Sequence, residues 1–180
     1  MGPNKLPLHN MAERHKGLTP EIAAAYAQAA RVCLDRHHVS PTEFSVQEQD
    51  QSTPAIVVWD ATDERTRAAW ANEIDTTEQG AYAMVLAAIE LTHGMVALRR
   101  AETTTGADYY VGLSEARIED FESMYRLEIA GRDRASDRMV YGTLLEKVEQ
   151  ARRGRSNLPA MAGVVGFLSR LIMLRMVEDK

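Results

Sequence analysis

Two acidic residues, Asp108 and Glu128, occur where neighbouring strands could bring them together. Asp108 follows a Gly-containing turn and enters an apolar run, and Glu128 lies in the alternating segment Tyr125–Ala130. Residues two apart in a strand share a face, so Leu127 and Ile129 are expected to enter the core while Glu128 lines the opposite surface. An Asp and a Glu converging in this way supply oxygen ligands for Mg²⁺ or Mn²⁺. The pair therefore predicts a metal site.

Each of these carboxylates also has an ordinary structural interpretation. Asp108 could complete the turn before its strand, and Glu128 could pair with a cation across a solvated sheet face. The two alternatives are linked, because one carboxylate without the other is a poor site for a metal ion.

The elements that must position the pair can be read from the hydrophobic pattern. In the second part of the chain it predicts helices over 80–93 and 135–153, a turn at 103–106, and strands over 95–100, 107–111, 124–130, 162–167 and 171–177. In the first part it predicts helices over 20–37 and 60–73 and strands over 44–48 and 55–59. Apolar spacing assigns Ile22, Met139 and Leu145 to buried helix faces. An α/β fold with a mixed central sheet flanked by helices follows.

Length and composition favour one compact domain in the cytoplasm. The chain has 180 residues, of which 45% are hydrophobic and 26% charged. No apolar run is long enough to predict a membrane span, and the first residues lack the pattern of a secretory signal. Cys33 is the single cysteine, which excludes a disulfide within the chain and a multi-cysteine zinc site.

The charge distribution gives two indications about partners. A net charge of −5 opposes unaided binding to nucleic acid and favours a protein partner or homo-oligomer that supplies positive charge. Residues 131–155, however, hold 7 basic and 4 acidic side chains. They include Arg152, Arg153 and Arg155, which form either a basic helix end or a patch that contacts nucleic-acid phosphates.

From residue 77 the predicted order is helix, three strands, helix and two strands, with Asp108 on the second strand and Glu128 on the third. This order resembles the PD-(D/E)xK nuclease-like superfamily over residues 77–177. Gly106-Ala107-Asp108 is similar to the metal-binding aspartate of that superfamily, and the segment 127–131 is similar to its E-x-K strand. The resemblance implies a restriction-endonuclease-like core over 76–177, with 1–75 as an N-terminal extension packed on it. It also implies Mg²⁺-dependent hydrolysis of nucleic acid. Chains with this resemblance occur among bacterial and phage-defence proteins.

One residue departs from the resembling pattern: Ala130 stands where the superfamily has its lysine. Phosphodiester hydrolysis needs an activated water and stabilisation of extra negative charge, so a replacement cation is expected. Lys147 and Gln150 lie three residues apart and could share one face of the following helix. Relocation of the lysine to this helix occurs in resembling enzymes. Arg126 is a second candidate, because a guanidinium can contact phosphate.

The preceding helix offers a third carboxylate, as in many of the resembling enzymes. Glu78 and Glu90 are twelve residues apart, which corresponds to about 18 Å along a helix. Only one of them can therefore reach the metal site. Glu78 also has a structural interpretation, because an acidic residue stabilises a helix start.

Two functions remain open at this point. The first is a metal-dependent nuclease, with DNA preferred over RNA only through the resemblance. The second is a non-catalytic protein of the same fold, which would serve as a subunit or regulatory module in a larger complex. The absence of a lysine at position 130 and the negative charge favour the second. Other chemistries find less support, because His37, His38 and His93 lack metal-site spacing and no nucleophile-elbow, phosphate-loop or dinucleotide motif occurs.

Overall fold

The computed structural model describes residues 4–103, 105–116 and 120–177. Its centre is an eight-stranded mixed sheet with the order β1-β3-β2-β8-β7-β6-β5-β4. The strands are β1 (Asn4–Lys5), β2 (Thr42–Glu48), β3 (Gln51–Val57), β4 (Met95–Arg100), β5 (Tyr109–Leu113), β6 (Tyr125–Arg132), β7 (Ala160–Gly166) and β8 (Leu171–Val177).

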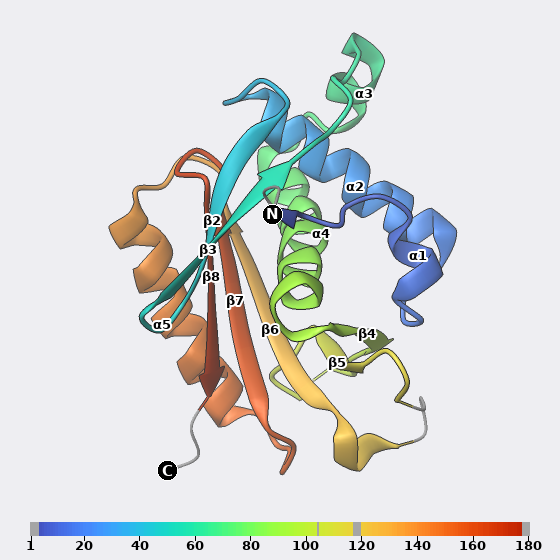
Figure 1. The fold of residues 1–180 in the computed structure, drawn as a ribbon, viewed down its shortest axis with the longest axis vertical. Coiled ribbons are helices and arrows are strands. Elements are labelled where there is room, and N and C mark those ends of the chain that lie inside the picture. The colour runs from blue at the N-terminus through green and yellow to red at the C-terminus, as the bar shows by residue number, and fades with distance from the viewer. Residues whose placement is uncertain (1–3, 104, 117–119, 178–180) are drawn as a thin grey trace.

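Helices cover both faces of this sheet. They are α1 (Met11–Arg14), α2 (Pro20–Asp35), α3 (Glu64–Ala69), α4 (Glu73–His93) and α5 (Asp137–Arg153), with a short 3₁₀ turn, η1, at Phe121–Ser123. Figure 1 shows α2 and α4 on one side of the sheet and α5 on the other. The predicted α/β fold with a mixed sheet between helices is therefore confirmed. No helix in the described ranges is both long enough and apolar enough to cross a bilayer.

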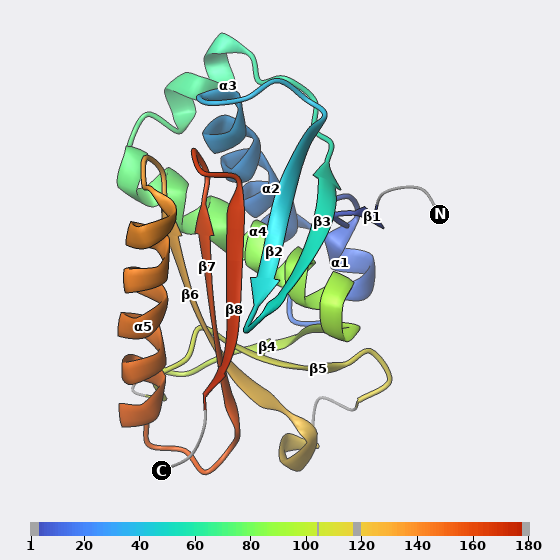
Figure 2. The ribbon, with the colours of Figure 1, turned by 60° about the vertical axis from the view of Figure 1, so that its left-hand side comes forward.

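The strand pairing determines what lies near Asp108 and Glu128. Strands β4 and β5, and then β5 and β6, pair antiparallel, whereas β6 and β7 pair in parallel. A parallel pair needs a crossover connection, and α5 supplies it. Figure 2 shows α5 running beside β6, β7 and β8. One face of β6 is consequently covered by α5.

Helix α4 begins earlier than the pattern predicts. Asn72 caps it by accepting hydrogen bonds from the backbone N–H groups of Ile74 and Asp75, and Gly94 ends it in a left-handed conformation with φ 65°. Gly80 lets it approach α2 closely: a Cβ there would lie 3.0 Å from the Ala30 backbone. The result is a helix of 21 residues, largely buried, that packs against α2 and against β4, β6, β7 and β8 of the sheet.

Two predicted buried faces are partly wrong. On α5 the residues that pack against the sheet are Val140, Leu144, Val148 and Ala151. Met139 and Leu145 are instead 55% and 41% exposed, because the helix is rotated relative to the face that the prediction chose. Ile22 on α2 is likewise 40% exposed.

The first part of the chain differs most from its predicted elements. Residues 51–54, which lie between the predicted strands 44–48 and 55–59, belong to β3, because the β2–β3 hairpin turns at Gln49 and Asp50 alone, with Gln49 at φ 52°. The predicted helix over 60–73 is reduced to α3, which Asp63 caps. Trp70 ends α3 and is half-buried, donating its indole N–H to Oε1 of Gln28 at 2.7 Å.

Residues on both sides of position 76 share one hydrophobic core. The largest cluster joins Phe44 of β2 and Val57 of β3 to Leu86 of α4 and Ile172 of β8. Strand β2 also pairs directly with β8. The N-terminal part is thus built into the central sheet.

The outer edge of β4 is partly covered by the segment before α2. Ala97 donates its backbone N–H to Nδ1 of His15 at 2.9 Å, and its carbonyl accepts from Gly17 N–H at 2.9 Å. Gly17 is needed there, because a Cβ would lie 2.7 Å from the backbone nitrogen of Arg99. These contacts satisfy backbone groups that an edge strand would otherwise leave unpaired.

Candidate active site

Asp108 lies immediately before β5 and continues its pairing with β6. Its backbone N–H donates to the Leu127 carbonyl at 2.7 Å, and its Oδ2 accepts from the Ile129 N–H at 2.8 Å. Because the chain turns away before residue 108, the Asp108 carboxylate accepts the Ile129 N–H in place of a backbone carbonyl. Since Glu128 lies between these two β6 residues, Asp108 is held directly beside it.

Glu128 points toward α5 rather than toward solvent, and its side chain is only 4% exposed. Lys147 of α5 donates from Nζ to Oε1 of Glu128 at 2.7 Å and to Oε1 of Gln150 at 3.1 Å. Burial raises the pKa of Glu128, the charge of Asp108 raises it further, and Lys147 opposes both effects. The solvated face considered for Glu128 is therefore wrong, because the crossover helix covers it.

Tyr82 of α4 connects three charged residues at the site. Its hydroxyl is within donating distance of Oε1 of Glu78 at 3.1 Å and of Oδ1 of Asp108 at 3.2 Å, and it accepts from Nη2 of Arg100 at 3.1 Å. Burial raises the pKa of Tyr82, and the two carboxylates add to that effect. A hydroxyl has one proton, so it can serve only one of the carboxylates at a time.

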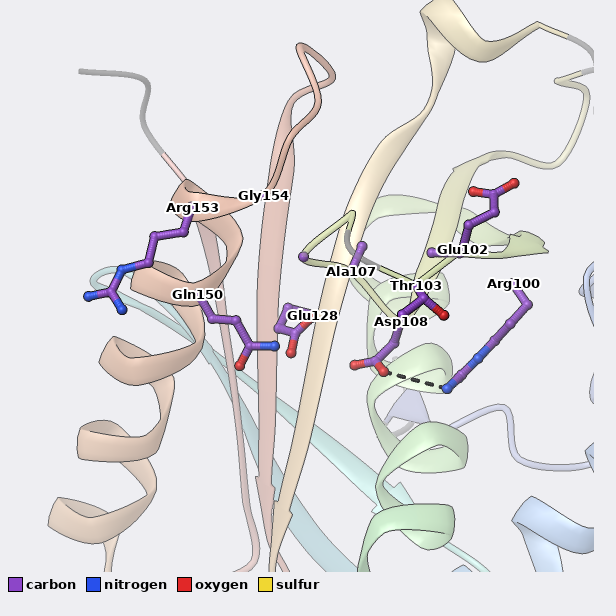
Figure 3. A pocket seen from close by; sticks show the side chains of 11 residues that line it. Arg100, Glu102, Thr103, Ala107, Asp108, Glu128, Gln150, Arg153 and Gly154 are labelled. Carbon is purple, nitrogen blue, oxygen red and sulfur yellow. Dashed lines mark ion pairs between the residues drawn. The ribbon is translucent and has the colours of Figure 1, made fainter.

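These side chains meet at an open polar pocket of about 540 Å³. Figure 3 shows Asp108 and Glu128 between Arg100 on one side and Gln150 and Arg153 on the other. The turn before β5 forms part of the wall and lies against the end of α5. Gly106, at φ 65°, makes this approach possible, because a Cβ there would lie 2.8 Å from Cα of Gly154.

Glu90 lies outside the pocket and has other partners. Its Oε1 forms an ion pair with Arg14, and its Oε2 lies 2.9 Å from Nε2 of His15. His15 is fully buried, and its Nδ1 accepts the Ala97 N–H, so Nε2 is the nitrogen that donates to Glu90. This acidic residue attaches the N-terminal segment to α4. Of the two candidates on that helix, Glu78 is the one near Asp108.

The four arginines that were predicted to contact nucleic acid lie in different parts of the structure. Arg126 is buried, and its guanidinium donates to the backbone carbonyls of Thr105, Ala151 and Leu158, at N···O distances of 3.1, 2.9 and 3.2 Å respectively. It thereby connects β6, the turn before β5 and the end of α5. Little of this guanidinium remains to contact a phosphate.

The three arginines near the end of α5 do not form one cluster around the pocket. Arg153 lines it, is 78% exposed and pairs with Glu149 at 3.2 Å. Arg152 lines a separate cleft together with Tyr141 and Arg175. Arg155 follows the helix and is exposed.

The histidines considered at the sequence level all have structural partners. His37 contacts Oδ1 of Asp133 at 3.0 Å, His38 contacts the Phe167 carbonyl at 2.7 Å, and His93 contacts Oε2 of Glu48 at 2.8 Å. Burial raises the pKa of Cys33 to about 12, so its thiol is protonated at neutral pH. These groups stabilise the fold and are separate from the pocket.

The donor set fits a hard divalent cation only as a partial site. Among the described residues, no group of three or more His, Cys, Asp or Glu side chains lies close enough to hold one ion. Asp108 and Glu128 nevertheless present two carboxylates to one polar pocket, and the repulsion between them is what a bound cation would relieve. Mg²⁺ commonly binds to one or two carboxylates and keeps water or substrate phosphate as its other ligands.

Tyr82 and Arg100 are site residues that sequence reasoning missed. The spacing of Tyr82 from Glu78 was available as a signal, because residues four apart share a helix face. Arg100 ends the strand before the turn that leads to Asp108, but its position against two tyrosine rings depends on tertiary contacts.

Comparisons with protein-family models, with curated proteins and with solved structures found no match.

Proposed function

We propose that this protein is a metal-dependent nuclease of the PD-(D/E)xK type whose lysine comes from α5. The observation that carries the proposal is the 2.7 Å contact between Lys147 and Glu128, whose carboxylate lines the same pocket as Asp108. A lysine on α5 supplies the positive charge that Ala130 lacks. Mg²⁺ or Mn²⁺ is the proposed cofactor.

The connectivity around the site supports the same class. Helix α4 is followed by β4, β5 and β6, then by the crossover helix α5 and by β7 parallel to β6. The order of these elements is similar to that of the restriction-endonuclease-like core. Asp108, immediately before β5, and Glu128 on β6 are the residues that the resemblance assigns to the metal.

The proposed roles follow from the chemistry of each side chain. Asp108 and Glu128 would hold the cation, with Glu78 close enough to act through Tyr82. The ion, when bound, would polarise the phosphate and lower the pKa of a water molecule. Lys147 favours the ionised form of Glu128 and would offset negative charge at the phosphate. Gln150 orients the ammonium group of Lys147 by accepting a hydrogen bond from it.

Cleavage by purified protein tests the proposal directly. Plasmid and single-stranded DNA would be incubated with Mg²⁺ or Mn²⁺ and wild-type protein, Asp108→Asn or Glu128→Gln. Both variants are expected to lose cleavage while remaining folded, with a cooperative thermal transition no lower than that of the wild type. Glu43→Gln changes an exposed carboxylate on β2 of the same sheet and serves as the matched control. Equal activity in the wild type and both site variants would contradict the proposal.

A non-catalytic binding module is the second candidate, and one observation favours it. Both oxygens of Asp108 already have hydrogen-bond partners, Ile129 N–H and the Tyr82 hydroxyl. The carboxylate could therefore serve the fold alone. A net charge of −5 also suits a partner with a basic surface. Failure of pure wild-type protein to cleave any substrate, also with its natural partner present, would favour this candidate.

A further inference from the structure

Arg100 is the cation that faces Asp108 across the pocket from α5. It ends β4, and its side chain is 48% exposed. Figure 3 shows it reaching toward Asp108, whose Oδ1 lies 3.6 Å from Nη2. That distance makes an ion pair without a short hydrogen bond.

Two aromatic rings determine where this guanidinium lies. Its central carbon is 4.6 Å from the ring centroid of Tyr82 and 4.8 Å from that of Tyr109. Tyr109 is itself held in place, because its hydroxyl is 2.7 Å from that of Tyr26. A guanidinium packed on aromatic faces loses less conformational freedom when it binds a ligand than one on an unrestrained side chain.

The hydrogen-bonding capacity of Arg100 exceeds what its neighbours use. A guanidinium has five N–H donors. Within the described ranges, the hydrogen bond of this group runs from Nη2 to the Tyr82 hydroxyl. The planar group can therefore present a pair of donors to a ligand in the pocket, and a phosphate accepts such a pair well.

The other cations near the pocket are less suited to this role. Lys147 is committed to Glu128 at 2.7 Å and to Gln150. Arg153 is 78% exposed and pairs with Glu149, and within the described part of the chain it lies over no aromatic ring. A phosphate entering between Asp108 and Glu128 meets two negative charges, so a positioned cation is needed on the β4 side.

We propose that Arg100 is the phosphate-binding residue of this pocket and contacts a substrate phosphodiester with two of its N–H groups. This inference rests on the proposed function, because it assigns the substrate contact within the same site. It also predicts that the pocket binds nucleic-acid phosphate without any divalent cation, which the cleavage assay does not test.

Fluorescence anisotropy of a fluorescein-labelled DNA oligonucleotide in EDTA provides the measurement. Affinity would be followed between about 50 and 200 mM salt, because each lost phosphate contact reduces the slope of log affinity against log salt. Arg100→Gln is expected to weaken binding about tenfold and reduce that slope by about 1. Arg100→Lys keeps the positive charge but lacks the planar pair of N–H donors. Its salt slope is therefore expected to stay near the wild-type value, and its affinity is expected to lie between those of the wild type and Arg100→Gln.

Arg99→Gln is the matched control, because Arg99 precedes Arg100 on β4 and forms an ion pair with Glu102 but does not itself line the pocket. Its salt slope is expected to equal that of the wild type. Equal slopes for wild type and Arg100→Gln would overturn the inference, and so would failure of the wild type to bind the oligonucleotide in EDTA. In both cases DNA cleavage with Mg²⁺ that depends on Asp108 would leave the proposed function standing. If Arg100→Gln does not fold, Arg100→Lys with wild-type affinity would count against the two-donor contact.

Discussion

The contact between Lys147 and Glu128 joins a buried carboxylate to a half-buried ammonium group. Burial penalises the charged form of Glu128, and the 2.7 Å contact with Lys147 opposes that penalty. A buried ion pair of this kind is weak support for stability by itself. Its presence next to Asp108 therefore favours a chemical role at the pocket over a purely structural one.

Glu128→Gln is expected to change how stability depends on pH. The pKa of Glu128 is raised above its ordinary value of 4.5, so the folded protein binds this proton more tightly than the unfolded chain. The resulting stabilisation is complete below pH 4.5 and is lost as pH rises through the raised pKa. Glutamine does not titrate, so the variant should gain stability relative to wild type as pH rises through this range. Urea unfolding at a series of pH values checks this, and a constant difference would contradict it.

Lys147→Met is expected to destabilise the protein by about 2 kcal/mol at neutral pH, because it leaves a buried carboxylate without its charged donor. It should also abolish cleavage. In a Glu128→Gln background the same substitution should cost less, since no charge remains to be compensated. Denaturant unfolding of the two single variants and the double variant gives the coupling energy. A coupling of zero, or full activity in Lys147→Met, would show that the relocated lysine has no role.

Some of the residues at this site could be predicted from their spacing in the sequence. Asp108 and Glu128 could be paired because strand alternation and the turn before residue 108 are local signals. Lys147 and Gln150 followed from helical spacing. Arg100 could not be assigned, because its position depends on ring contacts between α4, β4 and β5.

At the level of elements, α4 owes its position to a close approach by α2. Gly80 faces the backbone of Ala29 and Ala30, so Gly80→Ala is expected to cost about 1–3 kcal/mol through overpacking. Gly142 on α5 has open space where its Cβ would be, so Gly142→Ala should stabilise by about 0.5–1 kcal/mol through helix propensity. Thermal and urea unfolding of the two alanine variants compare them directly. Stabilisation by both substitutions would mean that α2 and α4 can separate at little cost.

The element boundaries show where sequence patterns are informative. The strand predicted over 171–177 is confirmed as β8, because a run of apolar residues after a turn leaves little ambiguity. The helix predicted over 60–73 was wrong in extent, because caps at Asp63 and Asn72 divide the segment into two helices. The depth of Glu128 could not be predicted either, since strand alternation does not show which helix covers a face.

The whole molecule is expected to unfold as one unit. Trp59 and Trp70 are the two tryptophans, and both lie before residue 76. Their fluorescence reports on the N-terminal part, whereas far-ultraviolet circular dichroism reports on every helix and strand. Because both parts share one hydrophobic cluster and one sheet, the two signals should change at the same urea concentration. Separate transitions would show that residues 76–177 hold together without the preceding segment.

The hydrogen bonds from His15 and Gly17 to Ala97 have a consequence for behaviour at high concentration. An open ladder at one end of a sheet can recruit the same strand from another molecule and start a growing polymer. Here Ala97, in the middle of the edge strand β4, already has its backbone N–H and carbonyl hydrogen-bonded to His15 and Gly17 of the same chain. At the opposite edge of the sheet, the outermost strand β1 is only two residues long in the described part of the chain. Neither margin offers a long template, so concentrated protein is expected to resist fibre formation.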